Sequence, residues 1–232
     1  MYAVWEWFPQ PHNFLRNGFV THSEALRDAT STVPNPTPLR GRNWTYDRRM
    51  PPDITPEMRA SAKSNPNTWL YVIDPLFESE ADVPPWGVVG AYPVDASGEI
   101  EDNFHPNDRY RPSPQALRMP TPPSTVDEVL QLINTGHQEA ATLPALLLDA
   151  SLLLYAASSE DRDVIGFPDS DGRVFVPVCT ASEHVPAAWP GWRVITGRDL
   201  APLLNGFPLL VNPVGPLSAI VPAELLAARV PA

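Results

Sequence analysis

A cysteine and a nearby histidine, Cys179 and His184, are the residues of this 232-residue sequence that first suggest chemistry. A thiol beside an imidazole can work as a nucleophile with its base. However, Cys179 ends the apolar run 174–179, where a free cysteine behaves as a small hydrophobic residue. No third residue is marked as an orienting partner. We therefore expect Cys179 to pack in a core, and we assign no catalytic residue.

The other polar residues give little support to metal or cofactor chemistry. No two of the five histidines lie four residues apart, and one cysteine cannot build a cysteine-based zinc site. The acidic loop 74–82 has no glycine for a calcium-binding turn, and the sequence Asp-Ser-Asp-Gly at 169–172 is typical of a tight turn. The glycine-rich phosphate motifs and the serine-hydrolase motif Gly-x-Ser-x-Gly are absent. We predict no metal and no cofactor.

Charge and composition narrow the choice of partner and compartment. The net charge is −11, whereas a nucleic-acid-binding protein needs a basic face for the phosphates. No apolar run reaches 18 residues, and the first residues lack the basic region of a secretory signal. The 30 prolines argue against a helical bundle, because each interior proline removes a helical hydrogen bond. We expect a cytoplasmic protein without a membrane span or a nucleic-acid partner.

Three segments organise the chain. Residues 1–52 hold six arginines against four acidic residues, and their closely spaced prolines predict an extended or partly disordered N-terminal segment. Residues 53–142 form a predicted α/β front segment, and residues 143–232 a predicted α/β domain. In the front segment we expect helices over 54–65 and from 124 or 125 onward, and strands at 69–73 and 86–94.

The C-terminal segment alternates short apolar runs with turns. We predict that 174–176 and 209–211 lie in one mixed sheet, flanked by helices at 198–204 and 223–229. Pro177 predicts an edge position for its strand, because proline cannot donate to a neighbouring strand. The predicted fold class is α+β, with a mixed, mainly antiparallel sheet and short flanking helices after a proline-rich N-terminal extension.

Parts of the sequence resemble a known group of proteins. Residues 51–100 are similar to the front part of actinobacterial proteins named type VII secretion system-associated. Residues 143–230 resemble the SseB N-terminal domain that such proteins contain. The front similarity lies in 54–59, 69–75, 83–90 and 110–114, and the second in 174–183, 197–200, 209–213 and 222–224.

The resemblance implies an accessory or adaptor protein of a type VII-like secretion system, and it supplies no catalytic residues. Such a protein acts through contacts with protein partners, for which we select aromatic residues that we expect to be exposed near prolines. Two alternatives stay open: an enzyme with a scattered Asp/Glu site using His105 or His184, and an immunity-type module that masks a partner surface. The sequence does not determine the oligomeric state. The selected contact residues are Trp86, Tyr110, Trp189 and Trp192.

Overall fold

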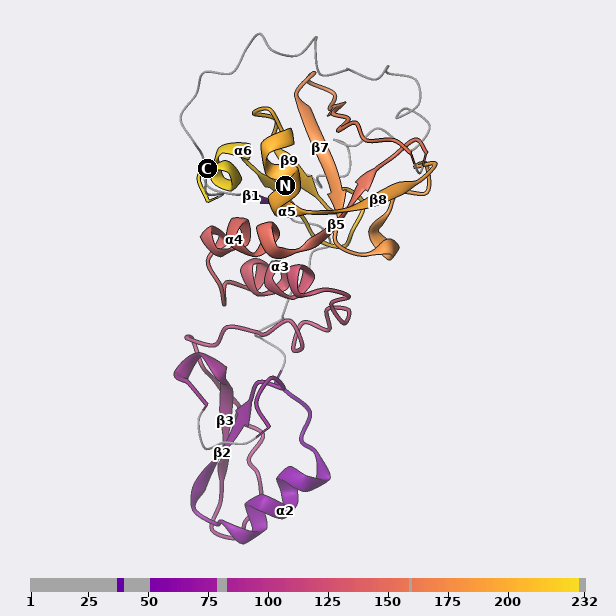
Figure 1. The fold of residues 1–232 in the computed structure, drawn as a ribbon. Helices are drawn as coiled ribbons and strands as arrows, with labels where there is room; N and C mark the ends of the chain where they lie inside the picture. Colours follow the sequence, from indigo (N-terminus) through magenta and orange to yellow (C-terminus); the bar gives the residue numbers. More distant parts are fainter. Residues whose placement is uncertain (1–36, 40–50, 79–82, 159, 230–232) are drawn as a thin grey trace. The chain divides into compact units, whose positions relative to one another are not determined.

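Two compact units make up the chain in the computed structural model, which describes residues 37–39, 51–78, 83–158 and 160–229 (Figure 1). Of the described residues, the front unit comprises 51–78, 83–120 and 135–137, and the C-terminal unit comprises 37–39, 121–134, 138–158 and 160–229. Both units combine mostly antiparallel sheet with short helices, so the predicted α+β class is confirmed. The boundary predicted at 142 differs from this division, because residues 121–134 belong with the C-terminal unit.

The front unit is a three-stranded antiparallel sheet with one helix. Its strand order is β2-β3-β4. Thr55 begins the helix as predicted, since its Oγ1 accepts a hydrogen bond from the N–H of Met58 at 3.3 Å and Pro56 occupies the first turn. The elements are α2 (Pro56–Ser64), β2 (Thr68–Ile73), the 3₁₀ helix η2 (Pro85–Gly87), β3 (Val88–Val94) and β4 (His105–Pro106).

A tight turn after β3 packs against the last turn of α2. Oδ1 of Asp95 accepts hydrogen bonds from the N–H groups of Ser97 and Glu99, both at 2.8 Å. Gly98 has a φ of +78°, and a Cβ there would lie 2.8 Å from the Cα of Lys63. Only glycine fits a turn that is both left-handed and this close to the helix.

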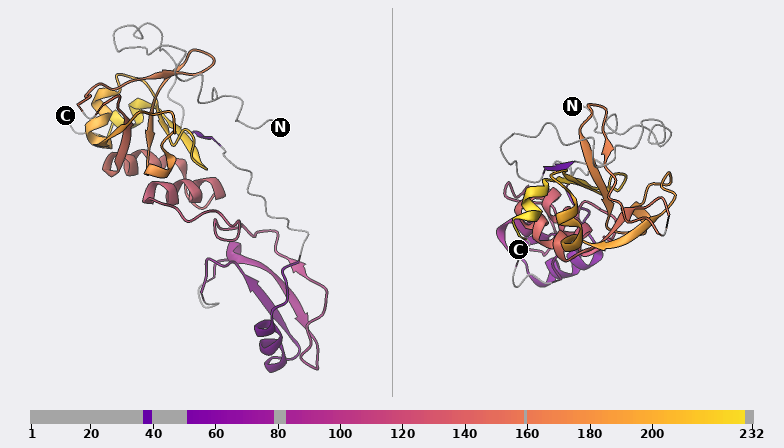
Figure 2. Two further views of the ribbon diagram at one scale, coloured as in Figure 1. Left: turned by 90° about the vertical axis from the view of Figure 1, so that its right-hand side faces the viewer. Right: turned by 45° about the horizontal axis from the view of Figure 1, so that its top comes forward.

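The C-terminal unit builds a larger sheet with helices beside it. The strands run in the order β1-β10-β9-β7-β5-β8, and β6 pairs with β7 off this path. Figure 2 gives two further views of the ribbon. The pair β7–β9 is parallel, and the others are antiparallel. The strands are β1 (Thr37–Leu39), β5 (Ser151–Tyr155), β6 (Phe167–Pro168), β7 (Val174–Cys179), β8 (Trp192–Thr196), β9 (Leu209–Val211) and β10 (Ser218–Val221). The helices are α3 (Thr125–Thr135), η3 (Ala140–Thr142), α4 (Leu143–Asp149), η4 (Ser182–His184), α5 (Gly197–Leu200), η5 (Ala201–Leu203) and α6 (Ala223–Ala227).

The pairing of β7 with β9 confirms that 174–176 and 209–211 share one mixed sheet. The predicted helices at 198–204 and 223–229 appear as α5 with η5 and as α6, and α4 packs against both α5 and α6. β9 is buried along its whole length, because Leu209, Leu210 and Val211 are each at most 5% exposed. Both faces of the sheet are therefore covered at β9.

The predicted edge position of Pro177 is wrong, because β7 lies between β9 and β5. The N–H of Val176 bonds to Pro208 on the β9 side, so the ring nitrogen of Pro177 faces the opposite side. On that side β6 pairs with residues 174 and 175, and β5 pairs with 178 and 179. Pro177 thus falls in the gap between two partners, where no N–H is needed.

One strand comes from the segment predicted to be extended. β1 pairs antiparallel with β10 at an edge of the large sheet, where a strand that contains proline is tolerated. The rest of residues 1–50 lies outside the described residues. Among the helices that the structure describes, none is long and apolar enough to cross a membrane.

Candidate functional site

A buried carboxylate, Asp127, lies at the centre of a polar network in the C-terminal unit. Ser124 caps α3, since its Oγ accepts a hydrogen bond from the N–H of Asp127 at 3.2 Å. The Ser124 hydroxyl in turn donates to Oδ2 of Asp127 at 2.5 Å, and the Thr180 hydroxyl lies 2.7 Å from the same oxygen. The network therefore connects the start of α3 to the residue that follows β7.

The second oxygen of Asp127 reaches two further elements. Oδ1 lies 3.0 Å from Nε2 of His184 on η4, and it accepts from Nδ2 of Asn212 at 2.9 Å. Asn212 follows β9 in the left-handed region with a φ of +52°, and its Oδ1 accepts from the N–H of Thr180 at 2.9 Å. Asp127 thus joins α3, η4 and the ends of β7 and β9.

Burial and hydrogen bonding oppose each other at this carboxylate. Asp127 is 6% exposed, His184 4% and Asn212 0%. Burial raises the pKa of Asp127, but hydrogen bonds from His184, Ser124 and Thr180, with the charge of His184, outweigh it and hold that pKa below its usual value. Four donors occupy the carboxylate, so the network suits a structural anchor better than a catalytic base.

Cys179 is unsuited to nucleophilic chemistry. Its Sγ donates a hydrogen bond to the carbonyl of His184 at 3.1 Å, and the residue is fully buried. Burial, together with the negative charge of Asp127, raises the pKa of the thiol to about 12. The thiolate needed for attack is therefore scarce at neutral pH.

Replacement of Cys179 by alanine is expected to cost stability without changing any binding activity. The cavity left by the sulfur and the lost hydrogen bond predict a loss of about 1–2 kcal/mol in the free energy of unfolding. Urea denaturation of both proteins measures this difference. A variant that folds as well as the wild type but no longer binds a partner would contradict the packing role.

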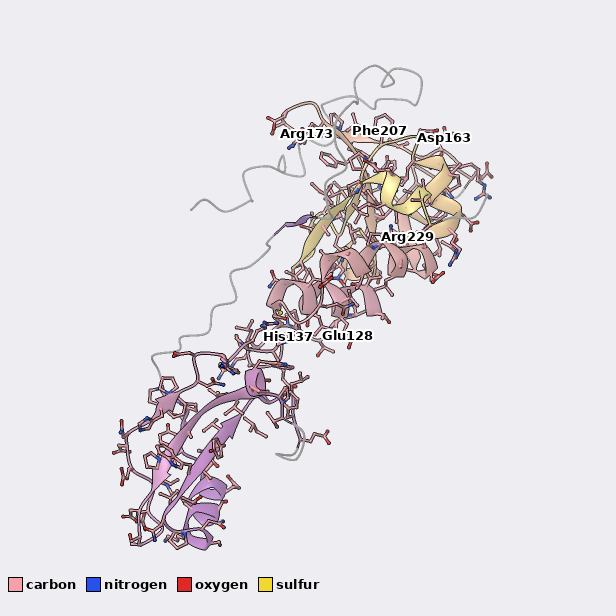
Figure 3. The ribbon with its side chains drawn as sticks, turned by 90° about the vertical axis from the view of Figure 1, so that its left-hand side faces the viewer. Glu128, His137, Asp163, Arg173, Phe207 and Arg229 are labelled. Atoms are coloured by element: carbon pink, nitrogen blue, oxygen red, sulfur yellow. The ribbon has the colours of Figure 1, made fainter. Side chains whose placement is uncertain are left out.

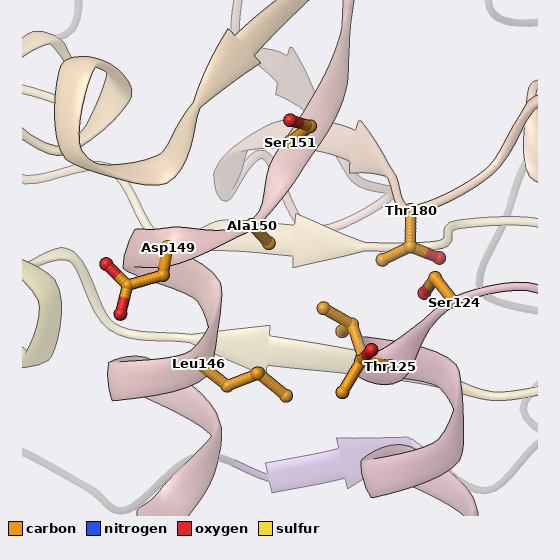
Figure 4. A pocket seen from close by; sticks show the side chains of 8 residues that line it. Ser124, Thr125, Leu146, Asp149, Ala150, Ser151 and Thr180 are labelled. Atoms are coloured by element: carbon orange, nitrogen blue, oxygen red, sulfur yellow. The ribbon is translucent and has the colours of Figure 1, made fainter.

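A pocket of about 450 Å³ lies beside the network (Figure 4). The hydroxyls of Ser124 and Thr180 at its wall are already bonded to Asp127. Its exposed carboxylate, Asp149, pairs with Arg198 at 2.7 Å. In the part of the chain that the structure describes, no group of three or more His, Cys, Asp or Glu side chains could hold a metal ion. The lining residues are Ser124, Thr125, Val126, Leu146, Asp149, Ala150, Ser151 and Thr180.

The expected exposure of two aromatic contact residues is wrong. Tyr110 is 2% exposed, and its hydroxyl donates to Oδ2 of the buried Asp74 at 2.9 Å. Trp189 is 8% exposed and packs in a cluster with Tyr155 and Cys179. A buried aromatic ring stabilises the fold and has little surface left for a partner, so both residues belong to the core.

The other two selected residues keep an accessible surface. Trp86 is half-buried in the front unit, where its ring lies 4.6 Å from that of His137 and 5.4 Å from that of Phe77. Trp192 is 46% exposed and is the first residue of β8. Of the four selected residues, Trp192 is therefore the best placed for a contact.

β8 presents an open apolar edge next to Trp192. Trp192 and Val194 are 46% and 64% exposed. The N–H of Ala156 donates to the carbonyl of Gly191, and the N–H of Gly197 donates to the carbonyl of Ala150. Since hydrogen-bonded and non-hydrogen-bonded pairs alternate along antiparallel strands, Trp192 and Val194 belong to non-hydrogen-bonded pairs with β5. The N–H and C=O groups of these two residues therefore point away from β5, toward the open side of β8.

Comparisons of the chain with protein-family models, with curated proteins and with solved structures find no match. The function is therefore inferred from the chain's own residues.

The buried network around Asp127 was not predicted from the sequence, although the pattern Ser124-x-x-Asp127 before an apolar run is a local signal for part of it. Its distant partners His184 and Asn212 have no such local sign.

Proposed function

We propose that this protein is a non-enzymatic accessory or adaptor protein that binds a protein partner along β8. The observation that carries the proposal is the open edge of β8, where exposed apolar side chains and outward-facing backbone groups occur at the same two residues, Trp192 and Val194. An extended segment of a partner can pair with such an edge through its backbone and pack on the side chains. Nothing else pairs with this side of β8 among the described strands.

The resemblance to type VII secretion system-associated proteins supports a secretion component as the partner. The alternative of an enzyme with His184 has weaker support, because His184 is buried against Asp127. His105 is exposed but lies with its ring 4.9 Å from that of Trp69, in an edge-to-face contact. Neither histidine is thus placed beside a free acid in a cleft, as a general acid–base site requires.

Changing Trp192 to alanine together with Val194 to serine is expected to abolish partner binding with little change in melting temperature. Central tryptophans dominate binding energy, so the loss is expected to exceed tenfold in affinity. Tagged wild-type and variant proteins are compared for the proteins that each captures in its native host, and purified partners are then titrated. Trp189 is left unchanged, because it is buried and its removal would open a cavity.

A matched control uses Leu203 of η5, which is 44% exposed on the same unit. Leu203→Ala is expected to bind as the wild type does. If Trp192→Ala/Val194→Ser captures and binds the same proteins with unchanged affinity, the partner does not use β8 and the proposed site is wrong.

A further inference from the structure

The front unit has an open edge of its own, at β2. Among the strands that the structure describes, β2 pairs only with β3, in the sheet order β2-β3-β4. Trp69 is 45% exposed and Tyr71 is 55% exposed, and both rings lie on one face because they are two residues apart on a strand. The β2–β3 register shifts between Val72 and Ile73, so the regular open stretch is 68–72.

The backbone of this stretch is available for pairing. Trp69 lies opposite Pro93, which has no N–H, and the carbonyl of Pro93 accepts from the N–H of Glu101 on the far side of β3 at 3.0 Å. Trp69 and Pro93 are therefore a non-hydrogen-bonded pair, and Tyr71 with Ala91 is the next such pair. The N–H and C=O groups of Trp69 and Tyr71 consequently point outward from β2.

The stretch 68–72 of β2 lacks several of the usual protections of an edge strand, because the register shift of β2 comes after it, between Val72 and Ile73. Its sequence, Thr-Trp-Leu-Tyr-Val-Ile, contains no charge, no proline and no glycine. Natural edge strands carry lysine, proline or a central bulge to prevent unwanted pairing. Five of the six residues are β-branched or aromatic, and such a run on an open edge favours addition of another strand.

The negative charge of the front unit favours a basic partner strand at β2. Residues 51–120 contain eleven acidic and five basic residues. Glu101 lies beside Pro93, across from Trp69, and Lys63 is within 3.9 Å of Glu99. The faces of Trp and Tyr rings attract cations, and so does an acidic surface. A second copy of the same acidic unit would instead be repelled.

We propose that β2 is a docking edge for an extended segment of a partner protein that carries arginine or lysine at alternate positions. The backbone of that segment bonds to Trp69 and Tyr71, and its basic side chains lie over the two rings. Strands in a pair are about 4.8 Å apart, so side chains on neighbouring strands are within reach. This edge is separate from β8 and does not depend on the function proposed for β8.

Fluorescence anisotropy of the full chain with labelled peptides tests the proposal. The probes are a peptide of about eight residues that alternates threonine with arginine, and a control that alternates threonine with glutamate. We expect saturable binding of the arginine peptide only, weakened by added salt because screening reduces exposed charge interactions. Equal binding of both peptides, or binding of neither, would overturn the proposal.

Two substitutions at one residue separate the ring from the backbone. Tyr71→Ala removes the ring and keeps the outward N–H, whereas Tyr71→Pro removes both, at an edge position that tolerates proline. We expect at least a tenfold loss of affinity for Tyr71→Ala and a further loss for Tyr71→Pro, with the far-ultraviolet circular dichroism unchanged. Leu76→Ala serves as the matched control, because Leu76 is 46% exposed in the same unit but outside β2, and it is expected to bind the arginine peptide normally.

The oligomeric state supplies an independent outcome. In sedimentation experiments we expect the wild type and Tyr71→Pro to have the same oligomeric state, because β2 does not bind a second copy. A dimer that forms with rising concentration and that Tyr71→Pro dissociates would show that a second copy occupies β2, and would overturn the proposal of a basic partner.

Discussion

Replacement of Leu210 by aspartate is expected to unfold the C-terminal unit. Leu210 is the central residue of β9 and is 5% exposed, between β10 on one side and β7 on the other. Removing a buried leucine costs about 2–5 kcal/mol, and burying an unpaired charge adds several more. The sum is comparable to the whole stability of a domain.

Hydrogen exchange resolves the effect by unit, because each unit has its own sheet. In Leu210→Asp, peptides covering β5, β7 and β9 are expected to lose protection, while peptides covering β2 and β3 keep theirs. Leu203→Asp is the matched control, since Leu203 is exposed in the same unit. A soluble Leu210→Asp protein that keeps protection in β9 would contradict the two-sided burial of this strand.

Local signals predicted many of the elements. Thr55, Pro56 and Glu57 marked the start of α2, and an apolar run ending at Asp74-Pro75 marked β2. These signals work because caps and turns are decided by neighbours in the sequence. The α+β class followed from the same mixture of short helices and strands.

Strand order did not follow from local signals. Proline usually marks an edge, yet Pro177 lies in a central strand, between β9 on one side and β5 and β6 on the other. It is tolerated there because β6 pairs with residues before it and β5 with residues after it. β8 was missed for a related reason. It is the short run Trp192–Thr196 with an arginine inside, and it becomes a strand by pairing with β5.

Exposure was the hardest property to predict. Tyr110 and Trp189 are close to prolines in the sequence, as Trp192 is, but they fill the cores of their units. The decisive partners are distant in the chain: Asp74 for Tyr110 and Tyr155 for Trp189. A single sequence does not identify such pairs, because they depend on which strands and loops the fold brings together.

Removing the carboxylate of Asp127 is expected to destabilise the C-terminal unit by about 3–5 kcal/mol. Asp127→Ala leaves the Asn212 amide, the His184 imidazole and two hydroxyls without their shared acceptor in a buried place. Asp127→Asn keeps one carbonyl oxygen and is expected to lose less. Glu128→Ala is the matched control, because the neighbouring Glu128 is exposed on the same turn of α3 (Figure 3).

The pH dependence distinguishes the charged network from simple loss of packing. The pKa of Asp127 is lower in the folded chain than in the unfolded chain, where it is about 3.9. Its contribution to the free energy of unfolding is therefore complete above about pH 5, and it disappears as the pH falls through the lower native pKa. Urea titrations between pH 7 and pH 3, with hydrogen exchange to follow the C-terminal unit, are expected to show a stability gap between wild type and Asp127→Ala that narrows in acid. If the gap stays constant across this range, the carboxylate is not held ionised by its neighbours, and Asp127 acts only by filling space.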